Sequence, residues 1–338
     1  MQKDGVSRQK LSVAKNLIDW FEVEGEDYPW RQTQDPWEIL ISEVMLQQTT
    51  ITSVIKNRRF EKFLKQFPSL EAISSASEES LLKAWEGLGY YNRVRNLQKT
   101  AVAVLEDWEG KFPNNIDDLQ KLPGIGPYTA AAIASFAFDI PAALVDGNVA
   151  RILTRIFDQE LPIDSSEGKK WLWETAEILV DQKKPRIYNS ALMELGQKVC
   201  RPKNPLCLTC PIQTSCDTQL PNELPRKKKK IALSQRKEFA LWSRRGSQLL
   251  LAKESGTRRK GFYRLPLRSE EEAADLELLS ESRYTITRYR VALQVYRETA
   301  KASSRSEEEW IPISELDDLP LISPVRKILP KLLAIDKL

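Results

Sequence analysis

Apolar positions recur at three- and four-residue intervals over residues 11–216, and the pattern breaks at Pro or Gly clusters such as Phe112-Pro113-Asn114. This spacing gathers apolar side chains on one face of a helix and predicts an all-α domain. Beyond it, residues 239–242, 249–252 and 289–296 form short runs, and the last of these alternates apolar and polar positions as a half-buried strand does. The pattern predicts a second domain of the α+β class.

Residues 217–235 separate these two patterns. The segment is polar, contains Pro221 and Pro225, and carries a basic run at residues 226–230. Such composition is typical of a linker, so we expect one domain over residues 1–217, a linker over 218–235 and a second domain over 236–338. The basic run is either a solvated part of this linker or a contact for DNA or a partner protein.

Composition narrows the class of protein. The 338 residues are 41% hydrophobic and 29% charged, and the longest strongly apolar stretch, residues 130–138, is too short to cross a bilayer. The polar start lacks a signal-peptide core, so we expect a soluble cytoplasmic protein. The net charge of +4 permits a polyanionic partner without establishing one. Histidine is absent, so acid–base chemistry must use carboxylates, lysine, tyrosine or cysteine.

The four cysteines are clustered with the spacing C-x6-C-x2-C-x5-C, at Cys200, Cys207, Cys210 and Cys216. In a cytosolic chain a disulfide framework is disfavoured, and four thiolates suffice for zinc or for a cubane cluster. Zinc sites made of four thiolates usually use two close pairs, whereas this run has one. The spacing favours an iron–sulfur cluster that acts as a scaffold, with zinc and four unrelated buried thiols as alternatives.

One acidic residue lies in unusually apolar surroundings. Asp35, Pro36 and Glu38 have the order of a capped helix start, and Glu43 lies in the helix that follows. Apolar residues flank Glu43 on almost every side, and no Lys or Arg occurs between residues 38 and 55. Desolvation should raise the pKa of this carboxyl and keep it a proton donor near neutral pH. The alternative is a surface Glu on an amphipathic helix.

A glycine turn and a second acid follow. The segment LPGIGPYTA, residues 122–130, places Gly124 and Gly126 in a tight turn before an alanine-rich helix. The free N–H groups of such a helix start suit a phosphate, although an ordinary helix–helix connection has the same pattern. Twenty residues after Gly126, Asp146 precedes Asn148 and a new helix. Considered alone, Asp146 is equally a helix N-cap.

The order and spacing of hairpin, acid and cysteine cluster resemble the endonuclease III superfamily of helix-hairpin-helix DNA glycosylases, over residues 11–217. Within this stretch ISEVMLQQT, GLGYYNRVRNL, LPGIGPYTA, LVDGNVARIL and the cysteine run look specifically like the MutY-type adenine DNA glycosylases. The resemblance implies an all-α helix-hairpin-helix domain with a [4Fe-4S] cluster. It also implies a monofunctional enzyme of base excision repair that removes adenine opposite 8-oxoguanine or guanine and leaves an abasic site.

Breaking a purine N9–C1′ bond develops positive charge on the sugar and negative charge on the base, so the reaction needs an acid and an anion. By resemblance, Glu43 protonates adenine N7 and Asp146 stabilises the sugar cation. The resemblance gives a catalytic set of Glu43, Asp146, Tyr128 and Asn148. For DNA and base contacts it gives Trp30, Arg31, Gln48, Thr49, Leu88, Tyr90, Gly124 and Gly126. Core packing is the alternative for Leu88 and Tyr90, which would otherwise fill the gap left by a flipped base.

Tyr128 separates two kinds of glycosylase. In the bifunctional members of the resembled superfamily the equivalent hairpin position is a lysine that forms a Schiff base and nicks the strand. A phenol does not form a Schiff base. We therefore expect a monofunctional glycosylase.

Residues 249–266 look like the family's C-terminal Nudix-like module, which faces the damaged guanine. The acidic Nudix helix is missing, since residues 269–272 are only a short run, so we expect recognition rather than pyrophosphate hydrolysis. Where the family has a Phe-Ser-His loop, this chain has Ile286, Thr287 and Arg288. Thr287 keeps a hydroxyl and Ile286 an apolar wedge, but arginine replaces histidine, which leaves the preference for 8-oxoguanine over guanine open. A plain strand and turn is the alternative.

The expected partner is double-stranded DNA with A·8-oxoguanine or A·G mispairs, bound by a monomer without membrane contact, at the nucleoid if the protein is bacterial. Two rivals stay open: a thymine or uracil mismatch glycosylase, and a catalytically idle lesion-sensing protein. The C-terminal recognition domain argues against the first. The pair Glu43 and Asp146 argues against the second.

Overall fold

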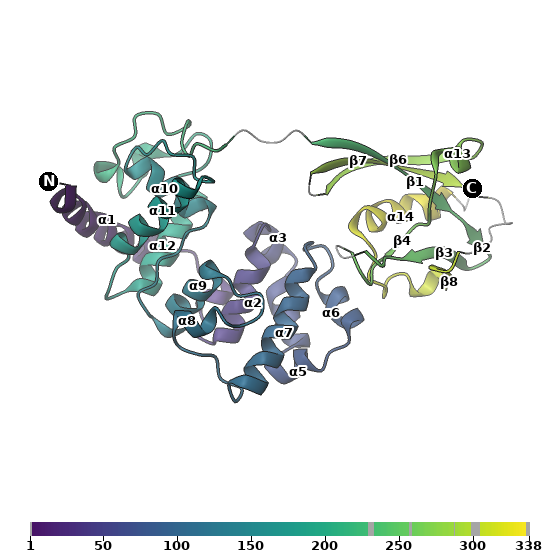
Figure 1. Ribbon diagram of the computed structural model, residues 1–338, viewed down its shortest axis with the longest axis horizontal. Coiled ribbons are helices and arrows are strands. Elements are labelled where there is room, and N and C mark those ends of the chain that lie inside the picture. The colour runs from purple at the N-terminus through teal and green to yellow at the C-terminus, as the bar shows by residue number, and fades with distance from the viewer. Residues whose placement is uncertain (1, 229–232, 257–258, 287, 299–304, 336–338) are drawn as a thin grey trace. The chain divides into compact units, whose positions relative to one another are not determined.

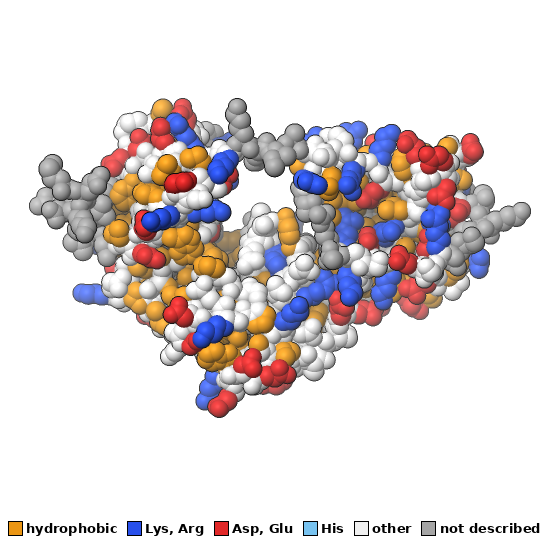
Figure 2. Space-filling model, viewed as in Figure 1, with side chains coloured by type: hydrophobic (Ala, Val, Ile, Leu, Met, Phe, Trp, Pro, Cys, Tyr) orange, Lys and Arg blue, Asp and Glu red, His pale blue; other side chains and the backbone are white. Residues whose placement is uncertain are grey.

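The computed structural model describes residues 2–228, 233–256, 259–286, 288–298 and 305–335. The chain divides into two compact units, residues 1–71 with 99–229 (unit 1) and residues 72–98 with 230–338 (unit 2). Figure 2 shows charged side chains of both signs interspersed on the visible surface. No helix in the described ranges has the length and apolar character needed to span a membrane.

The expected all-α character of the first part of the chain is confirmed, and its first helix begins at Gln2, before the predicted start. The helices are α1 (Gln2–Glu24), α2 (Pro36–Leu46), α3 (Ile51–Lys56), α4 (Arg59–Gln66), α5 (Leu70–Ser74), α6 (Glu78–Ala84), α7 (Asn92–Asp107), α8 (Ile116–Leu119), α9 (Pro127–Phe138), α10 (Gly147–Ile156), α11 (Ser166–Leu179) and α12 (Pro185–Lys198). Of these, α6 lies in unit 2, and α5 and α7 are divided between the units.

Two helix packings in unit 1 position the functional residues. Helices α1, α10, α11 and α12 lie together (Figure 1) around a core that includes Leu17, Ile152 and Leu195. Helix α9 packs against α2, and the alanines among residues 130–134 of α9 are buried. Small side chains allow the two helix backbones to approach closely, which brings the start of α9 to the middle of α2.

Unit 2 contains the strands β1 (Ser234–Trp242), β2 (Arg244–Arg245), β3 (Gln248–Lys253), β4 (Tyr263–Arg264), β5 (Leu267–Arg268), β6 (Glu277–Ile286), β7 (Tyr289–Arg297) and β8 (Glu308–Pro312), with the helices α13 (Glu270–Ala273) and α14 (Ser323–Ile335). One sheet has the order β5-β1-β7-β6, with β1 and β7 parallel, and the other is built from β2, β3, β4 and β8. The three strands expected from the sequence are confirmed as β1, β3 and β7. This part of the chain is α+β with a mixed sheet.

The alternating pattern of β7 explains its burial. Val291, Leu293 and Val295 are buried and the residues between them are not, because successive side chains point to opposite faces of a sheet. The acidic run forms α13, a helix of four residues that begins with a capping box between Ser269 and Glu272. The acidic helix is therefore short, as the sequence indicated.

Residues 72–98 contact the C-terminal residues within unit 2. Arg326 forms an ion pair with Glu86 at 2.6 Å, and the rings of Tyr91 and Phe262 lie 3.8 Å apart between centroids. In unit 1, Arg226 of the basic run pairs with Glu160 at 2.7 Å. Residues 229 and 230 of that run lie outside the described residues.

Candidate functional site

Helix α2 holds Glu43 inside unit 1. Asp35 caps the helix, since its Oδ1 accepts a hydrogen bond of 2.7 Å from the Trp37 N–H, and Pro36 occupies the first turn. The predicted helix start is thus confirmed. Most residues from 37 to 45 are buried, and Glu43 itself is 5% exposed. The interior position of Glu43 agrees with the apolar pattern around it rather than with the surface alternative.

The surroundings of Glu43 favour its neutral form. Its pKa is raised to about 7. Burial raises the pKa most, the hydrogen bond from Tyr128 lowers it, and the charge of Asp146 raises it. The Tyr128 hydroxyl donates this bond to Glu43 Oε2 over 2.8 Å. Burial and the charge of Glu43 hold the pKa of Tyr128 well above its ordinary value, so the phenol remains a donor. The predicted rise in the pKa of Glu43 is confirmed; its contact with Tyr128 was not foreseen.

Asp146 lies at the start of α10, where it serves as the N-cap. Its Oδ1 accepts a bond of 2.7 Å from the Val149 N–H, and its Oδ2 accepts one of 3.0 Å from Asn148 Nδ2. Capping and an anionic role are compatible, because both bonds are accepted by carboxylate oxygens at a helix N-terminus. The influence of Asp146 on the pKa of Glu43 places the two acids in one electrostatic environment.

Arg151 connects the start of α10, next to Asp146, to the cysteine segment, residues 200–216. Its Nη2 donates to Asn148 Oδ1 over 2.9 Å and to the Gly196 carbonyl over 2.7 Å, and its Nε donates to the Cys200 carbonyl over 2.8 Å. A Cβ on Gly196 would lie 2.6 Å from the Cβ of Asn148, so α10 and α12 require glycine there. Sequence reasoning did not identify Arg151, because a buried arginine gives no local signal.

A cavity of 40 Å³ adjoins Glu43 and has room for only a few water molecules. Two of the predicted base-contacting residues, Trp30 and Arg31, line it. The Trp30 ring stacks on Tyr28, with 5.2 Å between ring centroids. Arg31 is held by the fully buried Glu194, a residue that sequence reasoning missed because it is separated from Arg31 by more than 160 positions.

Gln48 and Thr49 follow the end of α2. Gln48 is exposed with φ at +57°, in the left-handed region that non-glycine residues seldom adopt. The Thr49 hydroxyl is buried, and among the described residues it has no hydrogen-bond partner. A strained, exposed amide at a helix end is a common feature of ligand-binding positions.

The glycine-flexed loop of unit 2 presents one of its two predicted wedge residues. Leu88 is 5% exposed and packs in the interior, in agreement with the core alternative, whereas Tyr90 is 60% exposed. Tyr90 has φ at +48°, and Arg93 fixes the loop by donating to the carbonyls of Leu88 at 2.9 Å and Gly89 at 3.0 Å. In this structure Tyr90 is available to a ligand and Leu88 is not.

The hairpin leads into α9 through two glycines. Gly124 has φ at +78°, which favours glycine, and Gly126 is the N-cap of α9 without a side-chain cap. A Cβ on Gly126 would meet no heavy atom within 4 Å. The start of α9 therefore has open space at Gly126 and no side-chain cap, which is compatible with an anion-binding helix start.

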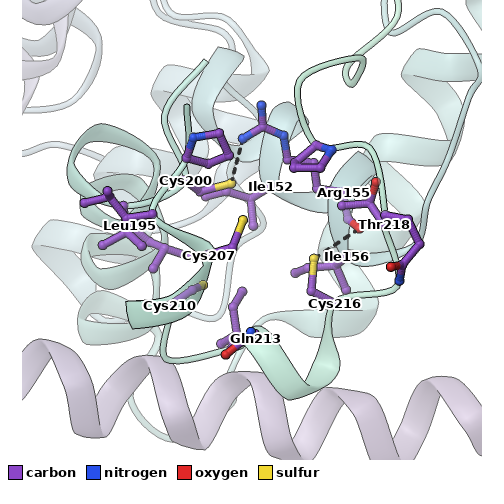
Figure 3. A pocket seen from close by; sticks show the side chains of 16 residues that line it. Ile152, Arg155, Ile156, Leu195, Cys200, Cys207, Cys210, Gln213, Cys216 and Thr218 are labelled. Carbon is purple, nitrogen blue, oxygen red and sulfur yellow. Dashed lines mark hydrogen bonds between the residues drawn. The ribbon is translucent and has the colours of Figure 1, made fainter. Parts of the chain in front are cut away.

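The four cysteines line one cavity of 310 Å³ in unit 1. Figure 3 shows the sulfur atoms of Cys200, Cys207 and Cys216 around this space. Among the described residues no three Cys, Asp or Glu side chains converge tightly enough to hold a single metal ion.

Arg155 supports the cysteine segment from within. It is 1% exposed, and its Nη1 donates to Cys200 Sγ over 3.2 Å and to the Arg201 carbonyl over 2.8 Å. Its own carbonyl accepts a bond of 3.3 Å from the Cys216 thiol. Arg155 thereby links both ends of the cysteine run to α10, Cys200 through its side chain and Cys216 through its backbone carbonyl.

The residues predicted to face the damaged guanine lie in unit 2. Ile286 ends β6 and, with Tyr90, lines a cavity of 730 Å³. Arg288 is exposed, and its Nε donates to the Tyr289 hydroxyl over 3.1 Å. Thr287 lies outside the described residues. The structure thus brings Ile286 to the loop of Tyr90.

Comparisons with known proteins agree with this site. Residues 41–177 match the model of the HhH-GPD superfamily of base excision DNA repair proteins. The chain is 42% identical to an adenine DNA glycosylase of Rattus norvegicus, over 60% of this chain and 40% of that protein. It is 37% identical to an adenine DNA glycosylase of Buchnera aphidicola, over 63% and 60%. The aligned region spans about half the length of these relatives.

Two solved structures are similar to part of this chain. A thermostable thymine-DNA glycosylase is 32% identical, with a TM-score of 0.57, over 62% of this chain and 96% of that one. A trapped complex of endonuclease III with DNA is 25% identical, with a TM-score of 0.53, over 62% and 95%.

Proposed function

Because the chain belongs to the HhH-GPD superfamily of base excision DNA repair proteins, we propose that it is a monofunctional glycosylase that removes adenine from A·8-oxoguanine and A·G mispairs in duplex DNA. The observation that carries the proposal is the buried Glu43, with its pKa raised to about 7. A carboxyl in this state donates a proton at physiological pH, which an ordinary glutamate does not. The relatives named adenine DNA glycosylase support adenine as the base.

In the proposed reaction Glu43 gives its proton to adenine N7 as the N9–C1′ bond breaks. Tyr128 holds the carboxyl in place and stabilises the carboxylate that forms, since its hydroxyl is already 2.8 Å from Oε2. Asp146, oriented by Asn148 and by its capping bond, stabilises the positive sugar until water adds at C1′ and gives up a proton, which restores the protonated form of Glu43. The abasic site remains because no lysine occupies the position of Tyr128.

We propose that Cys200, Cys207, Cys210 and Cys216 hold a [4Fe-4S] cluster. The cavity that all four cysteines line supports a group bound among them. When bound, the cluster supplies cohesion to the cysteine segment rather than a reacting group. The exposed cations Arg201 and Lys203 of this segment then suit DNA phosphates.

We also propose the domain limits 1–217 and 236–338, joined by the linker 218–235, with a Nudix-like second domain that recognises 8-oxoguanine. The mixed sheet with α14 and the four-residue α13 support a module without pyrophosphatase chemistry. Tyr90 and Ile286, on their shared cavity, are the proposed contacts to the partner base. The protein would act as a monomer on DNA in the cytoplasm, at the nucleoid if bacterial.

A thymine mismatch glycosylase is the second candidate, because the similar thymine-DNA glycosylase structure is covered over 96% of its length. Single-turnover assays on A·8-oxoguanine, A·G, G·T and G·U duplexes separate the two. We expect excision of adenine, faster or equal opposite 8-oxoguanine, with strand breaks only after alkali. Excision of thymine or uracil alone would favour the second candidate, and breaks without alkali would contradict a monofunctional enzyme.

A further inference from the structure

The starts of β1 and β7 bring the side chains of Arg236, Arg288 and Tyr289 together in unit 2. The two strands are parallel, with Ser234 beside Tyr289 and Arg236 beside Val291, and the Ser234 N–H donates to the Arg288 carbonyl over 2.9 Å. Neighbours in register share a face of the sheet, and so do residues two apart on one strand. Arg236 and Tyr289 therefore lie on the same face, at the end of the strand pair. Figure 2 shows Lys and Arg side chains over this end of unit 2.

Two guanidinium groups are held on the ring of Tyr289. The Cζ atom of Arg236 lies 3.7 Å from the ring centroid, and that of Arg288 lies 5.3 Å from it. Arg288 also donates its Nε to the Tyr289 hydroxyl over 3.1 Å, which leaves its terminal nitrogens free of that bond. Both arginines are exposed. Contact with an aromatic ring orders an arginine without neutralising it, so less conformational entropy is lost when it binds a ligand.

Arg236 and Arg288 differ from three other arginines of unit 2, which are paired with carboxylates. Within the described part of the chain no carboxylate pairs with Arg236 or Arg288. Those three arginines form ion pairs: Arg264 with Glu254 at 3.1 Å, Arg268 with Glu308 at 2.6 Å and Arg297 with Glu277 at 3.0 Å. The end of the strand pair therefore keeps the positive charge of these two side chains.

A hollow of 360 Å³ adjoins Arg236 and Tyr289. Two carboxylates line it, but each has a partner, since Glu238 accepts from the Tyr284 hydroxyl at 2.7 Å and Glu254 pairs with Arg264. The hollow leaves space for an anion beside the guanidinium group of Arg236. The planar fork of arginine matches the oxygen atoms of a phosphate.

We propose that Arg236 and Arg288, ordered on Tyr289, form a surface that contacts the phosphate backbone of duplex DNA. The inference rests on the proposed function for its partner and adds a second, sequence-independent grip that is separate from the hairpin of unit 1. Phosphate contacts position a protein on DNA and make its affinity depend on salt. This surface gives the C-terminal part of the chain affinity for DNA before any base is recognised.

The test is the salt dependence of binding to an undamaged, fluorescein-labelled duplex, measured by anisotropy with the full chain between 50 and 200 mM KCl. Each phosphate contact contributes about 0.9 to the slope of log K against log salt. We expect Arg236→Gln and Arg288→Gln each to flatten the slope by about 0.9, and the double variant by about 1.8. Over this fourfold salt range each variant would lose about 3.5-fold less affinity than the wild type does.

Lys237→Gln is the matched control. Lys237 is the next residue of β1, points to the opposite face of the sheet, and carries the same charge, with an ion pair to Glu270 at 3.6 Å. Its slope should equal that of the wild type. Unchanged slopes in the two arginine variants, or an equal change in the control, would overturn this surface alone. A wild-type chain that bound no duplex would overturn the proposed function as well.

Discussion

Removal of one hydroxyl tests how the acid is tuned. In Tyr128→Phe, Glu43 loses the hydrogen bond of 2.8 Å that stabilises its carboxylate, while the burial that raises its pKa to about 7 remains. Excision requires the protonated carboxyl, so the rate falls as the pH rises through this pKa. Loss of a bond to the charged form raises the pKa. The descending limb of the rate profile should therefore move to higher pH.

The size of the movement follows from the strength of such a bond. A hydrogen bond to an ionised group contributes about 1.5–3 kcal/mol, and about 1.4 kcal/mol corresponds to a tenfold change in proton affinity. Because Tyr128 also contacts the neutral acid, we expect the lower end of that range. The midpoint of the limb should rise by about one pH unit.

The assay is the single-turnover rate of adenine release from an A·8-oxoguanine duplex between pH 5 and 9. Tyr28→Phe is the matched control, since Tyr28 lines the same cavity and donates no hydrogen bond to Glu43. Its limb should stay at the wild-type position. A midpoint in Tyr128→Phe that is unchanged, or moved to lower pH, would refute the reasoning.

Two further predictions concern stability and the cysteine segment. Glu43→Gln should raise the free energy of unfolding at pH 8 by up to about 3 kcal/mol. The raised pKa of Glu43 stabilises the fold fully below the pKa of the unfolded chain, and this stabilisation is lost as the pH rises through about 7. Urea unfolding at pH 8 and pH 4 checks this, and an equal gain in the free energy of unfolding at both pH values would contradict it. Arg155→Met should lower the iron content of purified protein, because Cys200 and the neighbouring carbonyls lose their donor. Iron analysis beside Arg245→Met, an exposed arginine of unit 2, measures this, and iron equal to the wild type in both variants would contradict it.

Local patterns were sufficient to predict much of the fold. The three- and four-residue periodicity, the cap at Asp35 and the alternation of β7 all depend on neighbours in sequence, and the structure confirms them. The parallel pairing of β1 with β7 was not predicted, since it joins residues more than fifty positions apart. The association of residues 72–98 with the C-terminal part likewise depends on distant contacts such as Glu86 with Arg326.

The candidate site divides in the same way. Burial of Glu43 could be predicted from its apolar neighbours, and the gathering of the four cysteines around one cavity from their spacing. The bond from Tyr128 to Glu43 depends on how α2 packs against α9, and the support of Cys200 by Arg155 depends on how α10 meets the cysteine segment. Such buried polar contacts have no sequence period, so they appear only in the folded chain.

The central claim is that one buried carboxyl donates the proton that releases adenine. The most direct measurement compares wild type and Glu43→Gln for both binding to an A·8-oxoguanine duplex and release of free adenine in a single turnover. We predict the same Kd for both proteins, adenine release by the wild type and almost none by the variant. Adenine release by Glu43→Gln at the wild-type rate would contradict the account.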